Sequence, residues 1–275
     1  MGESRELVLV KLGGSLITNK KVEGEARPAT IERLAAEIAA WRAQDPGRLL
    51  VLGHGSGSFG HAAAARYGLG DGLRGGDPLG AAITQDQAAR LHRLVIEKLL
   101  AAGLPAFSWA ASTGLLCHAG RSRRSFFGSL LQALEAGLLP VFFGDVVTDE
   151  ALGAGIASTE AISLAFARAA ARKNLEITRA LWLGETEGIY DAAGATIAQI
   201  DGRNLESARR AASGSAGVDV TGGMDLRLRT AWELTRLGVE SLILDGNVPG
   251  RLGAALAGLE VPGTRIVRAA KSSRA

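Results

Sequence analysis

The sequence contains a single cysteine, Cys117, so it cannot form an internal disulfide bond, and a disulfide-stapled secreted domain is excluded. No apolar run approaches the ~20 residues that a membrane-spanning helix needs. The first residues lack the apolar core and cleavage site of a signal peptide, and Glu6 stands where N-myristoylation requires Ser or Thr. We therefore expect a cytoplasmic protein.

The sequence also lacks a large excess of charge of either sign. Its 31 basic and 28 acidic residues give a net charge of +3, so the pI near 9.3 does not indicate a basic face for nucleic acid. Lysine is scarce, because only six of the basic residues are lysine, and three of these, Lys11, Lys20 and Lys21, lie within the first 21 positions. In a chain that otherwise uses arginine, this clustering indicates a specific need for lysine.

The 275 residues, 47% of them hydrophobic, are enough for one large domain or two small ones. Short, nearly continuous apolar runs alternate with helical patterns, which predicts a mostly parallel sheet between two layers of helices. The expected strands are Glu6–Leu12, Arg48–Gly53, Leu104–Trp109, Leu139–Gly144, Arg179–Gly184 and Ser241–Asp245. The expected helices follow caps at Thr30, Thr84 and Ser158 and cover Met224–Leu237, with a loop over Gly194–Val218.

Glycine-rich segments follow the first two expected strands, at Gly13-Gly14-Ser15 and at Gly53–His61. Glycines after a strand let backbone N–H groups face a ligand, and anions such as phosphates bind in such loops. Because ligands bind at the carboxyl ends of parallel strands, two such loops predict a site that brings two phosphate groups together. The alternative is that both segments are only tight turns.

Two nucleotide-binding motifs can be excluded. Gly55, Gly57 and Gly60 match G-x-G-x-x-G, but the following 20 residues contain neither a strand nor an acid at its end, as a dinucleotide fold requires. The pattern G-x-x-x-x-G-K-[ST] is absent from the chain, so a P-loop kinase is not expected.

Four segments, Lys11–Lys20, His54–His61, Gly144–Val147 and Val220–Met224, together resemble the amino acid kinase superfamily and, within it, the isopentenyl phosphate kinases. The resemblance spans nearly the whole chain, and its most specific part is the histidine that ends Gly57-Ser58-Phe59-Gly60-His61. It implies a three-layer αβα sandwich with an acceptor lobe (1–175) and a nucleotide lobe (176–275). It further implies ATP as donor, Mg²⁺ held mainly by the nucleotide phosphates without a protein metal site, and a homodimer. The implied reaction converts isopentenyl phosphate, or a related small alkyl monophosphate, to the diphosphate for isoprenoid biosynthesis.

The resemblance also implies roles for individual residues. Lys11 would bridge the donor and acceptor phosphates, Lys20 (or its neighbour Lys21) would reach the nucleotide phosphates, and His61 would donate a hydrogen bond to the acceptor phosphate. The residues expected to bind the acceptor are Gly55, Ser56, Gly57, Gly60, Gly144, Asp145, Tyr67 and Ile83. The residues expected to bind the nucleotide are Gly13, Gly14, Ser15, Gly184, Gly188, Tyr190, Gly223 and Arg227. Tyr67 and Ile83, with Leu69, Leu73 and Ala82, offer apolar surface for a five-carbon tail, although they could equally belong to the core.

Three positions depart from the family pattern. Ser158-Thr159-Glu160 replaces the usual Ser-Gly-Asp, Arg227 replaces a lysine, and Glu185–Asp191 replaces Thr-Asp-Val-Asp-Gly. Glu160 is expected to orient Lys11 by an ion pair, although a first-turn acid is also favoured by the helix dipole alone. Three other functions stay open: a fosfomycin-type phosphonate kinase (Arg66 and Arg74), a carboxylate kinase, and an idle nucleotide-binding regulatory protein.

Overall fold

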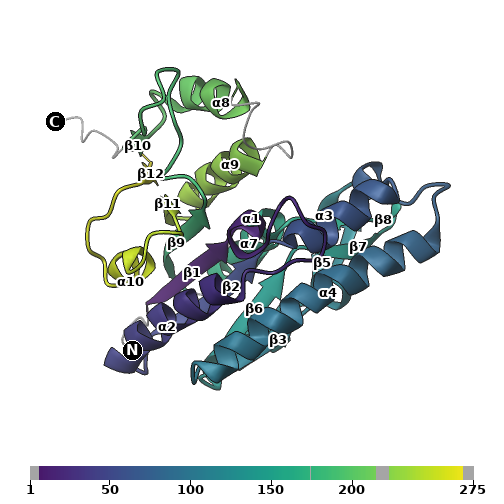
Figure 1. Ribbon diagram of the computed structural model, residues 1–275, viewed down its shortest axis with the longest axis horizontal. Helices are drawn as coiled ribbons and strands as arrows, with labels where there is room; N and C mark the ends of the chain where they lie inside the picture. Colours follow the sequence, from purple (N-terminus) through teal and green to yellow (C-terminus); the bar gives the residue numbers. More distant parts are fainter. Residues whose placement is uncertain (1–5, 174, 215–222, 269–275) are drawn as a thin grey trace.

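A computed structural model describes residues 6–173, 175–214 and 223–268. Its main sheet has eight strands in the order β10-β12-β11-β9-β1-β2-β6-β3, with β1 at the centre (Figure 1). The strands are β1 (Leu7–Leu12), β2 (Leu49–His54), β3 (Ala106–Trp109), β6 (Leu139–Phe143), β9 (Ile177–Gly184), β10 (Gln199–Ile200), β11 (Glu240–Asp245) and β12 (Thr264–Ile266). All neighbours are parallel except β11 and β12. The six predicted strands are confirmed, each to within two residues at either end.

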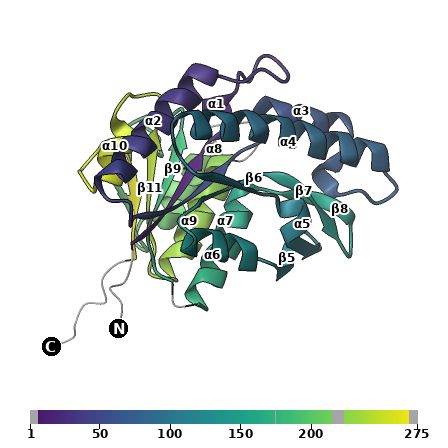
Figure 2. The same ribbon diagram turned by 90° about the horizontal axis from the view of Figure 1, so that it is seen from below.

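Helices cover both faces of this sheet (Figure 2). One layer contains α1 (Gly14–Ile17), α2 (Pro28–Gln44), α3 (Gly57–Arg66), α4 (Pro78–Ala101) and α10 (Arg251–Leu256), and the other α6 (Gly128–Glu135), α7 (Thr159–Ala171), α8 (Leu205–Gly214) and α9 (Gly223–Thr235). The alternation of β1 explains the two layers, because Val8, Val10 and Leu12 pack toward α2 and α4, whereas Leu7 and Leu9 pack toward α7 and α9. The predicted αβα sandwich is confirmed.

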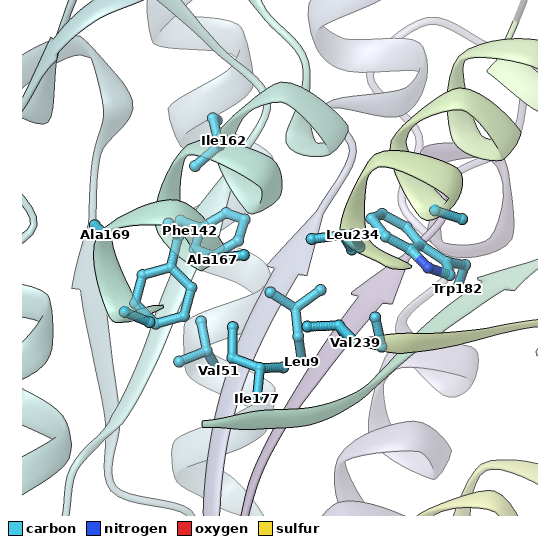
Figure 3. Close-up of a cluster of buried hydrophobic side chains, with 14 of the residues drawn as sticks. Leu9, Val51, Phe142, Ile162, Ala167, Ala169, Ile177, Trp182, Leu234 and Val239 are labelled. Carbon is cyan, nitrogen blue, oxygen red and sulfur yellow. The ribbon is translucent and has the colours of Figure 1, made fainter. Parts of the chain in front are cut away.

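The core on the α7 side shows how firmly the central strands are held (Figure 3). Leu9 of β1, Val51 of β2 and Trp182 of β9 are at most 1% exposed and lie in one cluster with Ile162 of α7 and Leu234 of α9. Each such buried side chain contributes roughly 1.5–3 kcal/mol. The carboxyl ends of β1, β2 and β9 are therefore fixed in position.

A second sheet was not predicted. It contains β4 (Leu115–His118), β5 (Arg121–Ser125), β7 (Asp145–Asp149) and β8 (Gly153–Ala157) in the order β5-β4-β7-β8, and α5 (Ala111–Gly114) leads into it. Neither outer strand reads as a run of large apolar residues, since β5 reads RSRRS and β8 reads GAGIA, with Ile156 as its one large apolar side chain. The 3₁₀ turn η1 (Leu69–Asp71) packs beside β8.

Two predicted helix starts and one predicted loop were wrong. Helix α2 begins at Pro28, before Thr30, and α4 begins at Pro78, where the carboxylate of Asp77 accepts a hydrogen bond from the Leu79 N–H. Proline at the first helical position determines both starts. The expected loop Gly194–Val218 includes β10 and α8, and its part from residue 215 onward lies outside the described residues. The cap at Ser158 is confirmed, because its Oγ accepts from the Ala161 N–H.

No helix in the described part of the chain has the length and apolar character needed to cross a membrane.

Candidate active site

The site forms where the parallel strands end together. In register, Leu12 of β1 lies opposite His54 of β2 and Leu183 of β9, and His54 lies opposite Phe143 of β6. The glycine segments after β1 and β2 therefore begin side by side, with Gly184 on one flank and Gly144 on the other. As predicted, the two glycine loops meet at one edge of the sheet.

The two loops touch through their backbones. A Cβ atom on Gly14 would lie 2.6 Å from the Gly57 nitrogen, and one on Gly55 would lie 2.8 Å from the Gly14 nitrogen. Gly57 has a positive φ of 49°, which strongly favours glycine. Close packing of one loop against the other therefore requires glycine at all three positions, whatever ligand the site binds.

Thr18 fastens the two loops together and was missed as a functional residue. Its Oγ1 donates to the Gly14 carbonyl (2.8 Å) and accepts from the Ser58 N–H (3.0 Å). The side chain is fully buried. Its position inside the Lys11–Lys20 segment was visible in the sequence, but nothing there indicated a contact with a residue 40 positions away.

Two of the predicted ligand-binding amides serve the sheet instead. The Gly13 N–H donates to the Leu183 carbonyl (2.8 Å) and the Gly55 N–H donates to the Leu12 carbonyl (3.0 Å). Both bonds extend the strand pairing by one residue beyond β1 and β2. A bound anion must therefore use other donors of the two loops, such as the N–H of Ser56.

Lys11, Glu160 and Arg227 form a buried charged cluster under these loops. The Lys11 Nζ lies 2.8 Å from the Glu160 Oε1, and the Arg227 Nε lies 4.0 Å from the same oxygen. All three side chains are less than one-tenth exposed. The expected ion pair between Glu160 and Lys11 is present, and the same carboxylate also faces Arg227, which was not expected.

The carboxylate of Glu160 is charged at neutral pH. Burial alone raises its pKa, but the Lys11 ammonium and then the Arg227 guanidinium more than offset burial, so the pKa of Glu160 is lowered. Two cations and one anion leave this cluster with a net charge of +1. Such a centre favours an anion above it.

Arg227 lies over the ends of β1 and β9. A Cβ atom on Gly184 would lie 2.9 Å from its Nη1, and one on Gly13 would lie 3.8 Å from its Nη2. The Arg227 Nε is buried without a hydrogen-bond partner. The guanidinium is thus held against two glycines that both were predicted to bind nucleotide, and it retains an unused donor.

Thr159 places Glu160 and was also missed. Its Oγ1 donates to the His54 carbonyl (2.7 Å), which ties the start of α7 to the end of β2. A Cβ atom on Gly53 would lie 2.7 Å from the Thr159 methyl group and 2.6 Å from the Phe142 ring. The threonine that replaces the family glycine is therefore accommodated by a glycine in β2.

Lys20 lies beside the turn that follows β9. Its Nζ is 3.5 Å from Glu185, the first residue after β9, and Arg27 binds the other oxygen of Glu185 at 3.0 Å. Lys21 is exposed in the same turn. Of the two candidate lysines, Lys20 is the one that the structure brings to the predicted nucleotide-side turn.

The rest of that turn is held by threonines. Gly188 lies against Thr264, whose Oγ1 accepts from the Ile189 N–H, and the Tyr190 hydroxyl accepts from the Glu187 N–H. Tyr190 is 40% exposed. Gly223 is the first residue of α9, the helix that carries Arg227, whereas Val220–Gly222 lie outside the described residues.

The predicted acceptor residues occupy the other flank. His61 is exposed in the second turn of α3, directly after Gly60, where a Cβ atom would overlap the Ser56 side chain. Tyr67 ends α3 and packs on Gly80 of α4, and with Leu73 it flanks a small core of Leu69, Ala81 and Val146. Ile83 is half-buried on α4.

Asp145 is held by backbone N–H groups of α5 and β7. The carboxylate is buried and accepts hydrogen bonds from the N–H groups of Ser112 (3.0 Å) and Val146 (2.9 Å). Burial raises its pKa. The side chain links α5 to β7, so its predicted contact with substrate stays a prediction, as does that of the neighbouring Gly144.

Comparisons with known proteins agree with this arrangement. A model of the amino acid kinase family matches residues 6–245. The isopentenyl phosphate kinase of Methanothermobacter thermautotrophicus is 34% identical over 275 residues, which cover 94% of this chain and 98% of the relative. That of Haloferax volcanii is 33% identical, with the same coverage. A crystal structure of an isopentenyl phosphate kinase superposes with a TM-score of 0.78 at 31% identity, over 95% of this chain and all of the other.

The family match spans most of the chain, and relatives above 30% identity are matched almost from end to end. The resemblance found in the sequence is thereby confirmed, and the chain belongs to the amino acid kinase family.

Proposed function

We propose that this protein transfers the γ-phosphoryl group of ATP to isopentenyl phosphate, giving isopentenyl diphosphate and ADP. The observation that carries the proposal is the end-to-end similarity to isopentenyl phosphate kinases. The site is consistent with it, because two glycine loops converge beside a buried lysine. Phosphoryl transfer asks the protein mainly for positioning and for positive charge near the equatorial oxygens.

Lys11 supplies that charge at the junction of the two loops. Its ammonium is a compact point charge that can face two phosphate groups at once. Glu160 fixes the ammonium at 2.8 Å and is itself held by the Thr159 bond to β2. In this mechanism Glu160 is a positioning residue, and Lys11 is the group that stabilises negative charge as the phosphoryl group moves.

The residues on the nucleotide side fit a polyphosphate. Arg227 combines a guanidinium over Gly13 and Gly184 with a buried Nε that lacks a hydrogen-bond partner. Lys20 adds a second cation at the turn after β9. Among the described residues no group of three or more His, Cys, Asp or Glu side chains could hold a metal ion, so in this proposal Mg²⁺ is carried by the ATP phosphates.

The acceptor phosphate lies, in this proposal, at Ser56–Gly57 with His61 as a further donor, and the apolar tail lies toward Tyr67 and Ile83. A phosphonate kinase would use Arg66 and Arg74 for a polar acceptor. In the structure Arg66 is paired with Glu23 (2.6 Å) and Arg74 donates to the Ala151 carbonyl. Both guanidinium groups are already engaged, which favours the alkyl phosphate.

The wider assignment rests on the family resemblance. The acceptor lobe comprises residues 1–175 and the nucleotide lobe 176–275, with β1 and β9 pairing at their boundary. The protein acts as a homodimer in the cytoplasm and contributes to isoprenoid biosynthesis. An idle regulatory protein is disfavoured because Glu160 still pairs with Lys11 despite its altered length.

The test is ADP release with MgATP and isopentenyl phosphate, with fosfomycin as a parallel acceptor. No ADP release at millimolar isopentenyl phosphate would contradict the proposal, and faster turnover of fosfomycin would replace it. His61→Ala should lower turnover strongly. His118→Ala, at an exposed histidine of β4 paired with Glu150, is the matched control and should leave turnover unchanged.

A further inference from the structure

A chain of hydrogen bonds runs from the second glycine loop through the layer of α4 to the far side of β6. The Nδ1 of His54 lies 3.0 Å from the Gly55 carbonyl oxygen, and its Nε2 lies 2.9 Å from the Nδ1 of His92. The Nε2 of His92 lies 2.7 Å from the hydroxyl of Ser108. The three residues come from β2, α4 and β3, which lie 38 and 16 positions apart along the chain.

Both imidazoles are enclosed. His54 is fully buried and His92 is 2% exposed. The Phe143 ring stacks on both, at 4.2 Å from His92 and 5.8 Å from His54 between ring centroids. Burial lowers the pKa of His54 to about 4 and that of His92 to about 2, so both rings are neutral at physiological pH.

The nitrogen that carries the proton on each imidazole follows from the groups at the two ends of this series of hydrogen bonds. A carbonyl can only accept, so the Nδ1 of His54 carries the proton, and its Nε2 must accept from His92. The Nδ1 of His92 therefore carries a proton as well, and its Nε2 accepts from the Ser108 hydroxyl. Each ring has one donor and one acceptor, and all the hydrogen-bonding groups are satisfied.

The orientation of the Gly55 carbonyl decides where the next N–H points. His54 shares its face of the sheet with Leu50 and Leu52, which pack toward α4, so the carbonyl is drawn to that face. A trans peptide is planar, and its N–H points opposite to its C=O. The Ser56 N–H is thus directed to the other face, where α7 lies (Figure 2).

That other face carries the charged cluster. Lys11 shares its face with Leu9, which packs toward α7, and Glu160 belongs to α7 itself. A Cβ atom on Gly144 would lie 3.7 Å from the Ser56 nitrogen and 3.3 Å from the Thr159 hydroxyl, which places the Ser56 amide on the α7 side. No acceptor among the described residues takes the Ser56 N–H.

We infer that His54, His92 and Ser108 are positioning residues that aim the Ser56 N–H at the phosphate of the acceptor. The inference rests on the proposed function. His92 has the essential task of holding His54 in the tautomer with a proton on Nδ1. In the other tautomer a lone pair would face the Gly55 carbonyl, and the peptide that carries the Ser56 N–H would turn.

Two substitutions of His92 separate this role from simple packing. Asparagine keeps an N–H donor close to the position of the imidazole Nδ1, whereas leucine has similar bulk and no donor. We expect His92→Leu to weaken binding of isopentenyl phosphate, measured by calorimetry and as KM, by roughly 10- to 100-fold, and His92→Asn to recover it to within about threefold. The KM for MgATP should be unchanged in both.

Val95→Ala is the matched control, because Val95 is fully buried one turn further along α4 and lies outside the chain of hydrogen bonds. It should lower the melting temperature without changing acceptor affinity. Equal affinities for the leucine and asparagine variants, or a wild-type affinity for His92→Leu, would overturn the inference. Calorimetry measures binding without turnover, so a failure of the proposed reaction is distinguishable from a failure of this inference.

Nitrogen-15 spectra of the imidazoles provide a test that needs no folded His92 variant. The wild-type protein should show His54 and His92 both neutral and both protonated on Nδ1. Ser108→Ala, at an exposed position, should shift the Nε2 resonance of His92. A proton on the Nε2 of either ring, or no shift in Ser108→Ala, would refute the chain as drawn.

Discussion

Replacing Glu160 with glutamine should destabilise the protein severely, because two buried cations depend on this carboxylate. The Lys11 Nζ lies at 2.8 Å and the Arg227 Nε at 4.0 Å from the same oxygen, and the three side chains are 6–9% exposed. The substitution keeps the shape of the side chain and removes its charge. Both cations stay buried, and the carboxylate that faces both of them is lost.

The expected loss of stability in Glu160→Gln follows from these distances. With an effective dielectric constant of ~20, the two attractions are about 6 and about 4 kcal/mol. Movement of the lysine and arginine toward water recovers part of this energy. The net cost of breaking a buried ion pair at one partner is about 3–5 kcal/mol. For a chain of this length we expect the melting temperature to fall by roughly 6–20 °C.

Glu185 provides a matched control on the same molecule. It also pairs with two cations, Lys20 at 3.5 Å and Arg27 at 3.0 Å, but its side chain is 27% exposed. Exposed ion pairs contribute about 0–1 kcal/mol. Thermal unfolding followed by circular dichroism should therefore show a small change for Glu185→Gln and a large one for Glu160→Gln.

Ligand binding gives a second measurement on the same variant. If the cluster lies under a polyphosphate site, an added phosphate chain supplies the missing negative charge, so ATP should raise the melting temperature of Glu160→Gln more than that of the wild type. A fall in melting temperature no larger than that of Glu185→Gln would refute the reasoning about burial. Equal stabilisation by ATP of variant and wild type would refute the placement of the nucleotide.

Three further predictions concern cations and histidines. Arg227→Met should raise the KM for MgATP about tenfold or more, with the acceptor KM unchanged, because a charge-assisted hydrogen bond contributes about 1.5–3 kcal/mol; an unchanged nucleotide KM would contradict this. In steady-state assays Lys11→Arg should lower turnover by roughly 100-fold, since a buried point charge is replaced by a wider planar group. Lys20→Arg, at a half-exposed position, should keep turnover near that of the wild type. Similar losses of turnover in the two variants would contradict this prediction. The pKa values of His54 (about 4) and His92 (about 2) are lowered, so below pH 6.5 the unfolded chain binds more protons than the folded one. The free energy of unfolding should therefore be at its full value above pH 6.5 and should fall as the pH is lowered toward 4. Urea titrations at several pH values measure this, and an unfolding free energy that does not change with pH would contradict it.

Six of the eight strands of the main sheet could be predicted, because strands covered by helices on both faces have a clear sequence pattern, whereas the short strands β10 and β12 were missed. Strands covered on both faces read as apolar runs, and β1, β2 and β9 are buried along nearly their whole length. The second sheet could not be predicted for the opposite reason. Strand β5 has four exposed residues out of five, so no hydrophobic period distinguishes it from a loop.

The candidate site, too, has one part that could be predicted from the sequence and another that could not. Lys11 and the two glycine loops were predictable because they follow strands directly, and the ends of parallel strands meet whatever the loops do. The roles of Thr18 and Thr159 were not predictable, since each side chain bonds a backbone group 40 or 105 positions away. The same holds for the contact between His54 and His92, because β2 and α4 bring two side chains 38 positions apart to 2.9 Å.

The scarcity of lysine has a different structural reason at Lys11 than at Lys20. Lys11 is buried between β2 and β9, and its Nζ lies 2.8 Å from Glu160, which favours a compact ammonium over a planar guanidinium. Lys20 is 46% exposed and shares Glu185 with Arg27, so arginine already makes the equivalent contact beside it. Where the family pattern has another lysine, Arg227 is accommodated because Gly13 and Gly184 leave space for its planar group. The need for lysine is therefore strongest where the strand ends leave least room, and composition alone did not distinguish Lys11 from Lys20.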